Sequence, residues 1–127
     1  MLRKLNLQIK DTVFEPGSTQ NKVYYRSEGK TTWYKVWILL EGSDLLYVAG
    51  VTYRLHSTFP DPEQNVRRTT TNPNCQLSIW SWGLFTIRAT VEDKFGRIHE
   101  YVHQMNYDKE LERRRQDTDF ESDETVA

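Results

Sequence analysis

The strongest constraint in the sequence is a repeated alternation of apolar and polar residues with a period of two. It is cleanest over YVAGVTYRLH (47–56) and LFTIRATVED (84–93), and LNLQI (5–9) follows the same rule. Successive side chains of a β-strand point to opposite faces of the sheet, so this period predicts half-buried strands. No long helical pattern occurs before residue 93. The chain is therefore expected to fold mainly into β-sheet.

Further runs extend the predicted sheet structure. KVYYRS (22–27) is typical of a short strand, and TTWYKVWILLEG (31–42) is apolar on both faces, as expected of a central strand that ends at Gly42. EDKFGRI (92–98) contains a glycine turn of hairpin length. Many short strands joined by turns predict an all-β sandwich of about seven to eight antiparallel strands.

The charge distribution separates the C-terminal end from the rest of the chain. Residues 1–107 contain 13 Lys and Arg against 10 Asp and Glu, whereas residues 108–127 contain 4 against 8. A chain of 127 residues suits one domain. We therefore predict a single β-sandwich domain over residues 1–107 and a charged, mobile tail over 108–127. The tail is expected to begin with a helical turn in which Glu110 and Arg114 pair at i and i+4.

The composition indicates an intracellular protein. Cys75 is the single cysteine, so no intramolecular disulfide is possible. No apolar run approaches the roughly 18 residues of a membrane span, and residues 1–10 lack the apolar segment of a secretory signal. We expect a cytoplasmic protein, or a nuclear one in a eukaryote, without membrane contact. The net charge of −1 predicts no direct contact with nucleic acid, and no cofactor is expected.

The segment HEYVH (99–103) fits H-E-x-x-H, the zinc signature of many metalloproteases. On a helix, the two histidines share a face and can bind one metal ion. On a strand they would lie about 13 Å apart, at roughly 3.3 Å per residue, which one ion cannot bridge. The segment follows a predicted strand and a turn, so a hairpin is the simpler geometry. We expect His99 and His103 to lie on the solvent face of a strand.

Two loop segments carry aromatic residues that turn formation does not require. In YRLHSTFPDP (53–62), a predicted strand enters a loop where Phe59 precedes two stiffening prolines. In IWSWGLF (79–85), Trp82 is expected on the loop itself, and Gly83 would allow a positive φ or the close approach of another backbone. Binding residues concentrate in loops held by a rigid scaffold. The alternative is that Phe59 and Trp82 cap the hydrophobic core.

Taken together, the two segments resemble a known family. LHSTFPDP (55–62) resembles the L-H-x-[ST]-F-x-x-P loop of YEATS domains, and SWGLF (81–85) resembles their G-W-G-x-F loop. The flanking strands GVTYRLH (50–56) and FTIRATV (85–91) and the spacing between the loops also agree. The similarity covers roughly residues 30–107 and looks closest to the prokaryotic branch. It implies an immunoglobulin-like β-sandwich that reads acylated lysine, in eukaryotes on histone tails.

The resemblance also implies a ligand pocket. Phe59 and Trp82 would be the aromatic walls that sandwich the flat acyl-amide. Thr58 would accept the amide N–H, and the backbone N–H of Trp82 would donate to the acyl carbonyl. His56 would orient the first loop and border the pocket.

The resemblance also covers the rest of the second loop, and the sequence departs from the family pattern at two places. Gly83 would let the second loop turn, and Phe85 would return to the core. Ser81, also assigned to the ligand-binding set, replaces the first glycine of G-W-G and could narrow the loop or add a hydrogen bond. EGKTTW (28–33) lacks the histidine or aromatic residue that the family usually offers before its tryptophan.

Three hypotheses for function follow. The first is a non-enzymatic binding module that holds an acylated-lysine peptide between Phe59 and Trp82. The second is a protein–protein interaction domain of a signalling or defence system, without acyl-lysine recognition. The third is a zinc hydrolase using HEYVH (99–103). A thiol or serine enzyme is not expected, because Cys75 has no histidine beside it in the sequence. The oligomeric state is not predicted.

Overall fold

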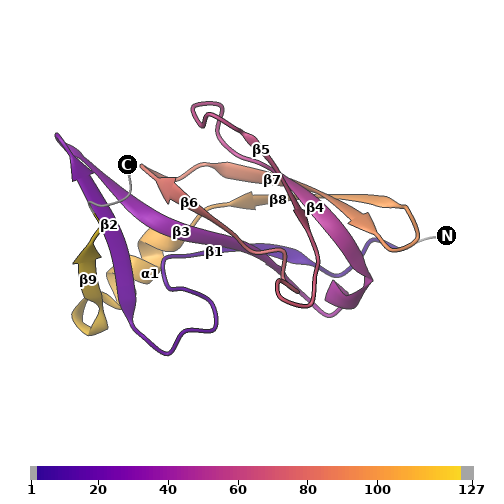
Figure 1. Cartoon of the computed structure of the whole chain (residues 1–127), viewed down its shortest axis with the longest axis horizontal. Coiled ribbons are helices and arrows are strands. Elements are labelled where there is room, and N and C mark those ends of the chain that lie inside the picture. The colour runs from indigo at the N-terminus through magenta and orange to yellow at the C-terminus, as the bar shows by residue number, and fades with distance from the viewer. Residues whose placement is uncertain (1–2, 124–127) are drawn as a thin grey trace. The chain divides into compact units, whose positions relative to one another are not determined.

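The computed structural model describes residues 3–123 (Figure 1). The strands are β1 (Gln8–Thr12), β2 (Lys22–Glu28), β3 (Thr31–Glu41), β4 (Val48–Arg54), β5 (Glu63–Arg67), β6 (Leu77–Ser81), β7 (Thr86–Asp93), β8 (Ile98–Gln104) and β9 (Asp119–Ser122). The helical segments are η1 (Leu45–Tyr47), α1 (Tyr107–Arg113) and η2 (Arg115–Asp117). Across this described range, no helix has the length and apolar character needed to cross a membrane.

The contacts along the described chain divide it into two compact units. One holds residues 3–10, 39–77 and 85–105. The other holds residues 11–38, 78–84 and 106–123.

The first unit contains a four-stranded sheet in the order β5-β4-β7-β8. The pairs β4–β5, β4–β7 and β7–β8 are antiparallel. Alternate residues of β4 and β7 form its buried face, with Val51 opposite Val91 and Tyr53 opposite Ala89. The half-buried strands predicted from the period of two are therefore confirmed here. A register shift between Val48 and Gly50 marks a β-bulge in β4.

The second sheet has five strands, in the order β1-β3-β2-β9 with β6 also pairing with β3. The residues of β3 from Val36 to Leu40 are all buried. This confirms the prediction of a central strand that is apolar on both faces, because β3 has strand neighbours on both sides. The strand ends before Gly42, which has a φ of 142°. The pair β2–β3 is antiparallel, whereas β2–β9 is parallel.

The described residues contain more strands than the sequence predicts. β5 is not expected from the sequence, because EQNVR has one apolar residue and lies at the exposed edge of its sheet. β6 overlaps IWSWGLF (79–85), which is predicted as a loop, because only Leu77 and Ile79 follow the alternation before Ser81. The all-β class is confirmed. The described residues hold nine strands where about seven to eight are predicted, and β9 pairs with β2 in parallel.

The C-terminal segment has more structure than the predicted helical turn. The carboxylate of Asp11 accepts the backbone N–H groups of Asn106 and Tyr107, at 2.9 and 2.8 Å, at the start of α1. Glu110 accepts the backbone N–H of Val13 at 2.8 Å. These bonds tie the helix to the strand end at residues 11–13.

Arg114 does not pair with Glu110 as expected. Its guanidinium instead lies 4.2 Å from the ring centre of Phe14 and donates to Asn21 at 2.5 Å. β9 then adds a parallel strand to the edge of β2, with an ion pair of 3.4 Å between Lys22 and Glu121. The mobility of residues 108–127 stays a prediction, and its last four residues, 124–127, lie outside the described range.

Candidate functional site

The first predicted loop, residues 55–62, leaves the end of β4 and returns to β5. The backbone N–H of Leu55 donates to the carbonyl of Pro62 at 2.7 Å and closes the base of the loop. Inside it, the N–H of Phe59 donates to the carbonyl of His56 at 3.1 Å. The loop therefore has a fixed backbone path that presents Thr58 and Phe59.

His56 organises this loop through one ring nitrogen. Its Nδ1 accepts the backbone N–H of Thr58 at 3.2 Å, so this nitrogen carries no proton. Thr58 Oγ1 lies 2.9 Å from the same nitrogen and donates its hydroxyl hydrogen to it. The threonine oxygen keeps lone pairs that can accept a further hydrogen bond. This is the role that the family resemblance assigns to Thr58.

Phe59 is half-buried against Phe85, which is part of the core. The two ring centres are 5.5 Å apart in a tilted arrangement, and the His56 ring meets Phe85 edge-on at 6.1 Å. Such contacts restrict the rings without covering them fully. The ring of Phe59 therefore packs against the buried ring of Phe85, and part of the Phe59 side chain remains exposed to solvent.

The second predicted loop follows β6 and carries Trp82 as its exposed aromatic residue, with 39% of its surface accessible. Ser81, at the start of the loop, is fully buried. Its hydroxyl donates to the carbonyl of Gly83 at 2.5 Å and accepts the N–H of Gly83 at 3.3 Å. Since that proton is used, the hydroxyl of Tyr107, 3.1 Å away, is the donor to Ser81. Burial raises the pKa of Tyr107, which keeps its proton available.

These contacts change the roles that the sequence predicted for Ser81 and Gly83. Ser81 adds hydrogen bonds, as predicted, but they hold the loop in place and leave its buried hydroxyl no surface for a ligand. Gly83 has neither a positive φ nor a close neighbour, since an added Cβ would meet nothing within 4 Å. The structure therefore gives no conformational reason for glycine at this position.

The six predicted ligand residues thus fall into two groups. His56, Thr58 and Phe59 are brought together in one loop, and Ser81, Trp82 and Gly83 in another. The two loops belong to different units of the chain. That they line one pocket stays a prediction from the family resemblance.

The bond between Ser81 and Tyr107 gives a testable coupling. We expect Ser81→Ala and Tyr107→Phe each to lower the free energy of unfolding by about 1 kcal/mol, because each leaves a buried polar group without its partner. The double variant should cost less than the sum, with a coupling of about 1 kcal/mol in urea denaturation. Fully additive losses would contradict the hydrogen bond. Sequence reasoning missed Tyr107 because 26 residues separate it from Ser81.

The segment HEYVH belongs to strand β8, so the expected hairpin with β7 is confirmed. The helical context that the zinc signature requires is missing. One part of the prediction is wrong: His99 is buried, while Ile98 and Val102 occupy the solvent face. On the same inward face as His99, Tyr101 donates its hydroxyl to the carbonyl of Leu5 at 2.7 Å.

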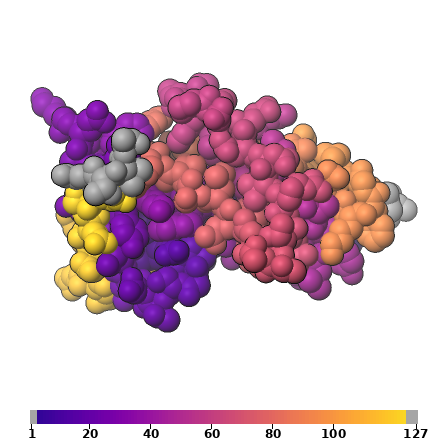
Figure 2. All heavy atoms as spheres, viewed as in Figure 1, coloured from indigo at the N-terminus to yellow at the C-terminus, as the bar shows by residue number. Residues whose placement is uncertain are grey.

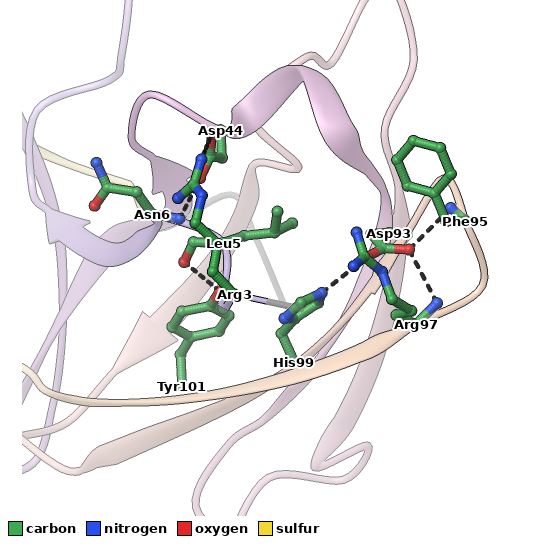
Figure 3. A network of polar contacts seen from close by, with 9 residues as sticks. All are labelled: Arg3, Leu5, Asn6, Asp44, Asp93, Phe95, Arg97, His99 and Tyr101. Carbon is green, nitrogen blue, oxygen red and sulfur yellow. Dashed lines mark hydrogen bonds and ion pairs between the residues drawn. The ribbon is translucent and has the colours of Figure 1, made fainter. Parts of the chain in front are cut away.

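His99 is buried because its side chain forms a hydrogen bond with the buried carboxylate of Asp93. The Asp93 carboxylate is fully buried and accepts from His99 Nε2 at 2.9 Å and from Arg97 Nε at 2.8 Å (Figure 3). It also accepts the backbone N–H groups of Phe95 and Arg97, at 2.8 and 2.9 Å. Burial alone would raise the pKa of Asp93, but these hydrogen bonds outweigh it and hold the pKa well below its usual range. Across residues 3–123, no group of three or more His, Cys, Asp or Glu side chains is arranged to bind a metal ion.

The two sheets and their loops place the chain among all-β domains of the immunoglobulin-like sandwich class. A family model described as the prokaryotic YEATS domain matches residues 34–106. The chain therefore belongs to the prokaryotic YEATS domain family, and the resemblance noted in the sequence is confirmed.

Similar proteins include a curated relative and several solved structures. Transcription initiation factor TFIID subunit 14 of Schizosaccharomyces pombe is 32% identical over 72 residues, which is 55% of this chain and 28% of that protein. The Yaf9 YEATS domain recognising an H3K122suc peptide superposes with a TM-score of 0.55 at 17% identity, covering 87% of this chain and 81% of the other. The Yaf9 YEATS domain bound to H3K27ac gives 0.50 at 15% identity, covering 84% and 77%. At such identities the structural likeness concerns the fold.

Proposed function

We propose that this YEATS domain is a non-enzymatic reader that binds an acylated lysine side chain through Phe59 and Trp82. The observation that carries the proposal is that both aromatic residues of the family motif keep solvent-accessible surface on internally bonded loops. Similar solved structures are YEATS domains with acylated histone peptides. The natural target here would be a peptide or protein segment bearing such a lysine. The proposal needs no cofactor or direct nucleic acid contact, and it keeps the predicted cytoplasmic location, or the nucleus in a eukaryote.

The chemistry of an acylated lysine suits these residues. Acylation removes the charge, so the side chain can enter an apolar site, but its amide keeps one donor and one acceptor that need partners. The lone pairs of Thr58 would accept the amide N–H, because its own hydrogen is directed at His56. The backbone N–H of Trp82 would donate to the acyl carbonyl.

The expected affinity is modest. Two aromatic contacts contribute ~0.5–1.5 kcal/mol each beyond burial, and two hydrogen bonds about 1 kcal/mol each. Association costs must be subtracted from this sum. We therefore expect a Kd in the micromolar range or weaker, which corresponds to a binding free energy of about −8 kcal/mol or less in magnitude.

The test is an NMR titration of backbone amides with acetyl-lysine and crotonyl-lysine peptides, with the unmodified peptide as control. We expect saturable shifts at Thr58, Phe59 and Trp82 with the acylated peptides alone. Trp82→Ala should weaken binding at least about tenfold in calorimetry, which corresponds to about 1.4 kcal/mol. Phe95→Ala is the matched control, since Phe95 is an exposed aromatic residue on the β7–β8 turn, outside both loops. Unchanged affinity in Trp82→Ala would refute the assignment.

A second candidate function is a protein-interaction domain without acyl-lysine recognition. It is favoured by β8, the edge strand of its sheet, whose solvent face exposes Ile98 and Val102 at 59% each. Exposed apolar residues beside an unpaired strand edge are suited to a protein partner. No shifts with acylated peptide up to millimolar concentration would favour this function over the reader.

A further inference from the structure

A cavity lies within the unit that contains β2, α1, β9 and the first part of β3. Its volume is about 680 Å³, and all of its lining residues come from this unit. The segments concerned are neighbours: β9 pairs with β2, and in the space-filling view the yellow C-terminal residues lie against the purple residues of the second strand (Figure 2). None of the residues assigned to acyl-lysine binding contributes to it.

The sheet supplies one wall, built from two cross-strand pairs. Tyr25 is opposite Tyr34, and Ser27 is opposite Thr32. Residues two apart on a strand point to the same face, so the two tyrosines and the two hydroxyl residues line the cavity side by side. Phe120 of β9, 40% exposed, adds a third aromatic ring at the edge.

The helical segment supplies the opposite wall. Asp108, Leu111 and Glu112 line the cavity, and their spacing of i, i+3 and i+4 places them on one face of α1. Arg115, at the start of η2, completes this wall. Glu110, which anchors the helix to residues 12 and 13, is not in this set. The face that lines the cavity is therefore separate from the contact that holds the helix.

The helical wall carries more negative than positive charge. Two carboxylates, Asp108 and Glu112, face the cavity with one guanidinium, Arg115. Neither carboxylate forms an ion pair with another residue of the described chain. The cavity thus combines a net negative lining with three aromatic rings.

We propose that this cavity binds a positively charged side chain, arginine or lysine, of a partner polypeptide. A cation is attracted to the faces of tyrosine and phenylalanine rings. Its N–H groups find strong acceptors in Asp108 and Glu112 and weaker ones in the hydroxyls of Ser27 and Thr32. An anionic ligand would have Arg115 as the one cationic side chain of the lining and would meet two carboxylates. The proposal is independent of acyl-lysine recognition.

The test uses an arginine pentapeptide, acetyl-Gly-Gly-Arg-Gly-Gly amide, on the full chain, with its citrulline analogue as the neutral control of the same shape. We expect NMR shifts at Tyr25, Tyr34 and Leu111 with the arginine peptide, and at least about tenfold weaker binding of the citrulline peptide. The lysine pentapeptide should bind as well. The variant Asp108→Asn with Glu112→Gln should weaken arginine binding at least about tenfold. Asp117→Asn is the matched control, because Asp117 follows the same helix but does not line the cavity.

Several outcomes would overturn this proposal. Equal binding of the arginine and citrulline peptides would show that the charge is not recognised. Unchanged affinity in the double variant, or an equal loss in Asp117→Asn, would place the recognition elsewhere. Binding of acetyl-Gly-Gly-Glu-Gly-Gly amide in place of the arginine peptide would assign the cavity to anions through Arg115. Trp82→Ala should leave arginine binding unchanged, so failure of the acyl-lysine proposal and failure of this one can be told apart.

Discussion

Replacing Gly42 by alanine is expected to lower the free energy of unfolding by about 3 kcal/mol. Gly42 has a φ of 142°, a conformation that side chains rarely adopt. A Cβ at this position would lie 2.2 Å from the carbonyl oxygen of Asn6 and 2.9 Å from the Cα of Leu7. Both neighbours are backbone atoms, which cannot rotate away. The main chain must therefore move, and urea denaturation would measure the loss.

Gly83→Ala is the matched control for this prediction. Its added Cβ would meet nothing within 4 Å, and its φ lies outside the left-handed region. We expect the free energy of unfolding to stay within about 0.5 kcal/mol of the wild type. If Gly42→Ala were as well tolerated as Gly83→Ala, the close approach of residues 6 and 42 would be wrong.

The comparison of the two glycines shows which part of the fold can be predicted from sequence. The apolar run that stops before Gly42 correctly predicted that β3 ends there, because the run and the glycine after it are local features of the sequence. The requirement for glycine comes from Asn6, 36 residues earlier, and no local pattern reports it. Gly83 was predicted to have a conformational role because it belongs to the family motif. A motif identifies the family, but it does not determine the backbone conformation at each of its residues.

Burial of charged residues was the weakest part of the sequence interpretation. The turn after β7 predicted β8 as the second strand of a hairpin, but it could not decide which face is buried, since Ile98 and Val102 are more apolar than His99. The buried carboxylate of Asp93 reverses the expected orientation by binding His99. The C-terminal segment shows a similar limit of local patterns. Its acidic composition predicts a charged tail, but composition does not report the hydrogen bonds by which Asp11 and Glu110 dock α1.

For the candidate site, the sequence identified the loops and the structure adds how each is held. Trp82 was expected on the loop and lies there with 39% of its surface exposed. Each loop is supported by a residue far away in the chain. Tyr107 forms a hydrogen bond with Ser81, and the ring of Phe85 packs against Phe59. A motif records which residues a family uses, but not which distant side chains fix their positions.

Asp93→Ala is expected to be the most destabilising substitution of a polar residue in the described part of the chain. It removes one buried carboxylate and leaves two backbone N–H groups, an arginine and a histidine without their acceptor. We expect the midpoint of urea denaturation to fall by about 1 M or more. Asp93→Asn should lose less. Its amide oxygen can replace Oδ1, which accepts from the turn backbone, but its NH₂ cannot replace Oδ2 as the acceptor for Arg97.

The pH dependence separates the charge of Asp93 from its shape. The folded-state pKa of Asp93 lies below its unfolded value of 3.8, so the stabilising contribution is complete above about pH 4 and is lost as the pH falls. The side-chain amide of the Asp93→Asn variant cannot titrate, and the difference in unfolding free energy between wild type and variant should therefore shrink below about pH 4. Urea denaturation at neutral pH and at about pH 3 measures this difference. A difference that stays constant across this range would mean that Asp93 contributes hydrogen bonds but no titrating charge, and its depressed pKa would be refuted.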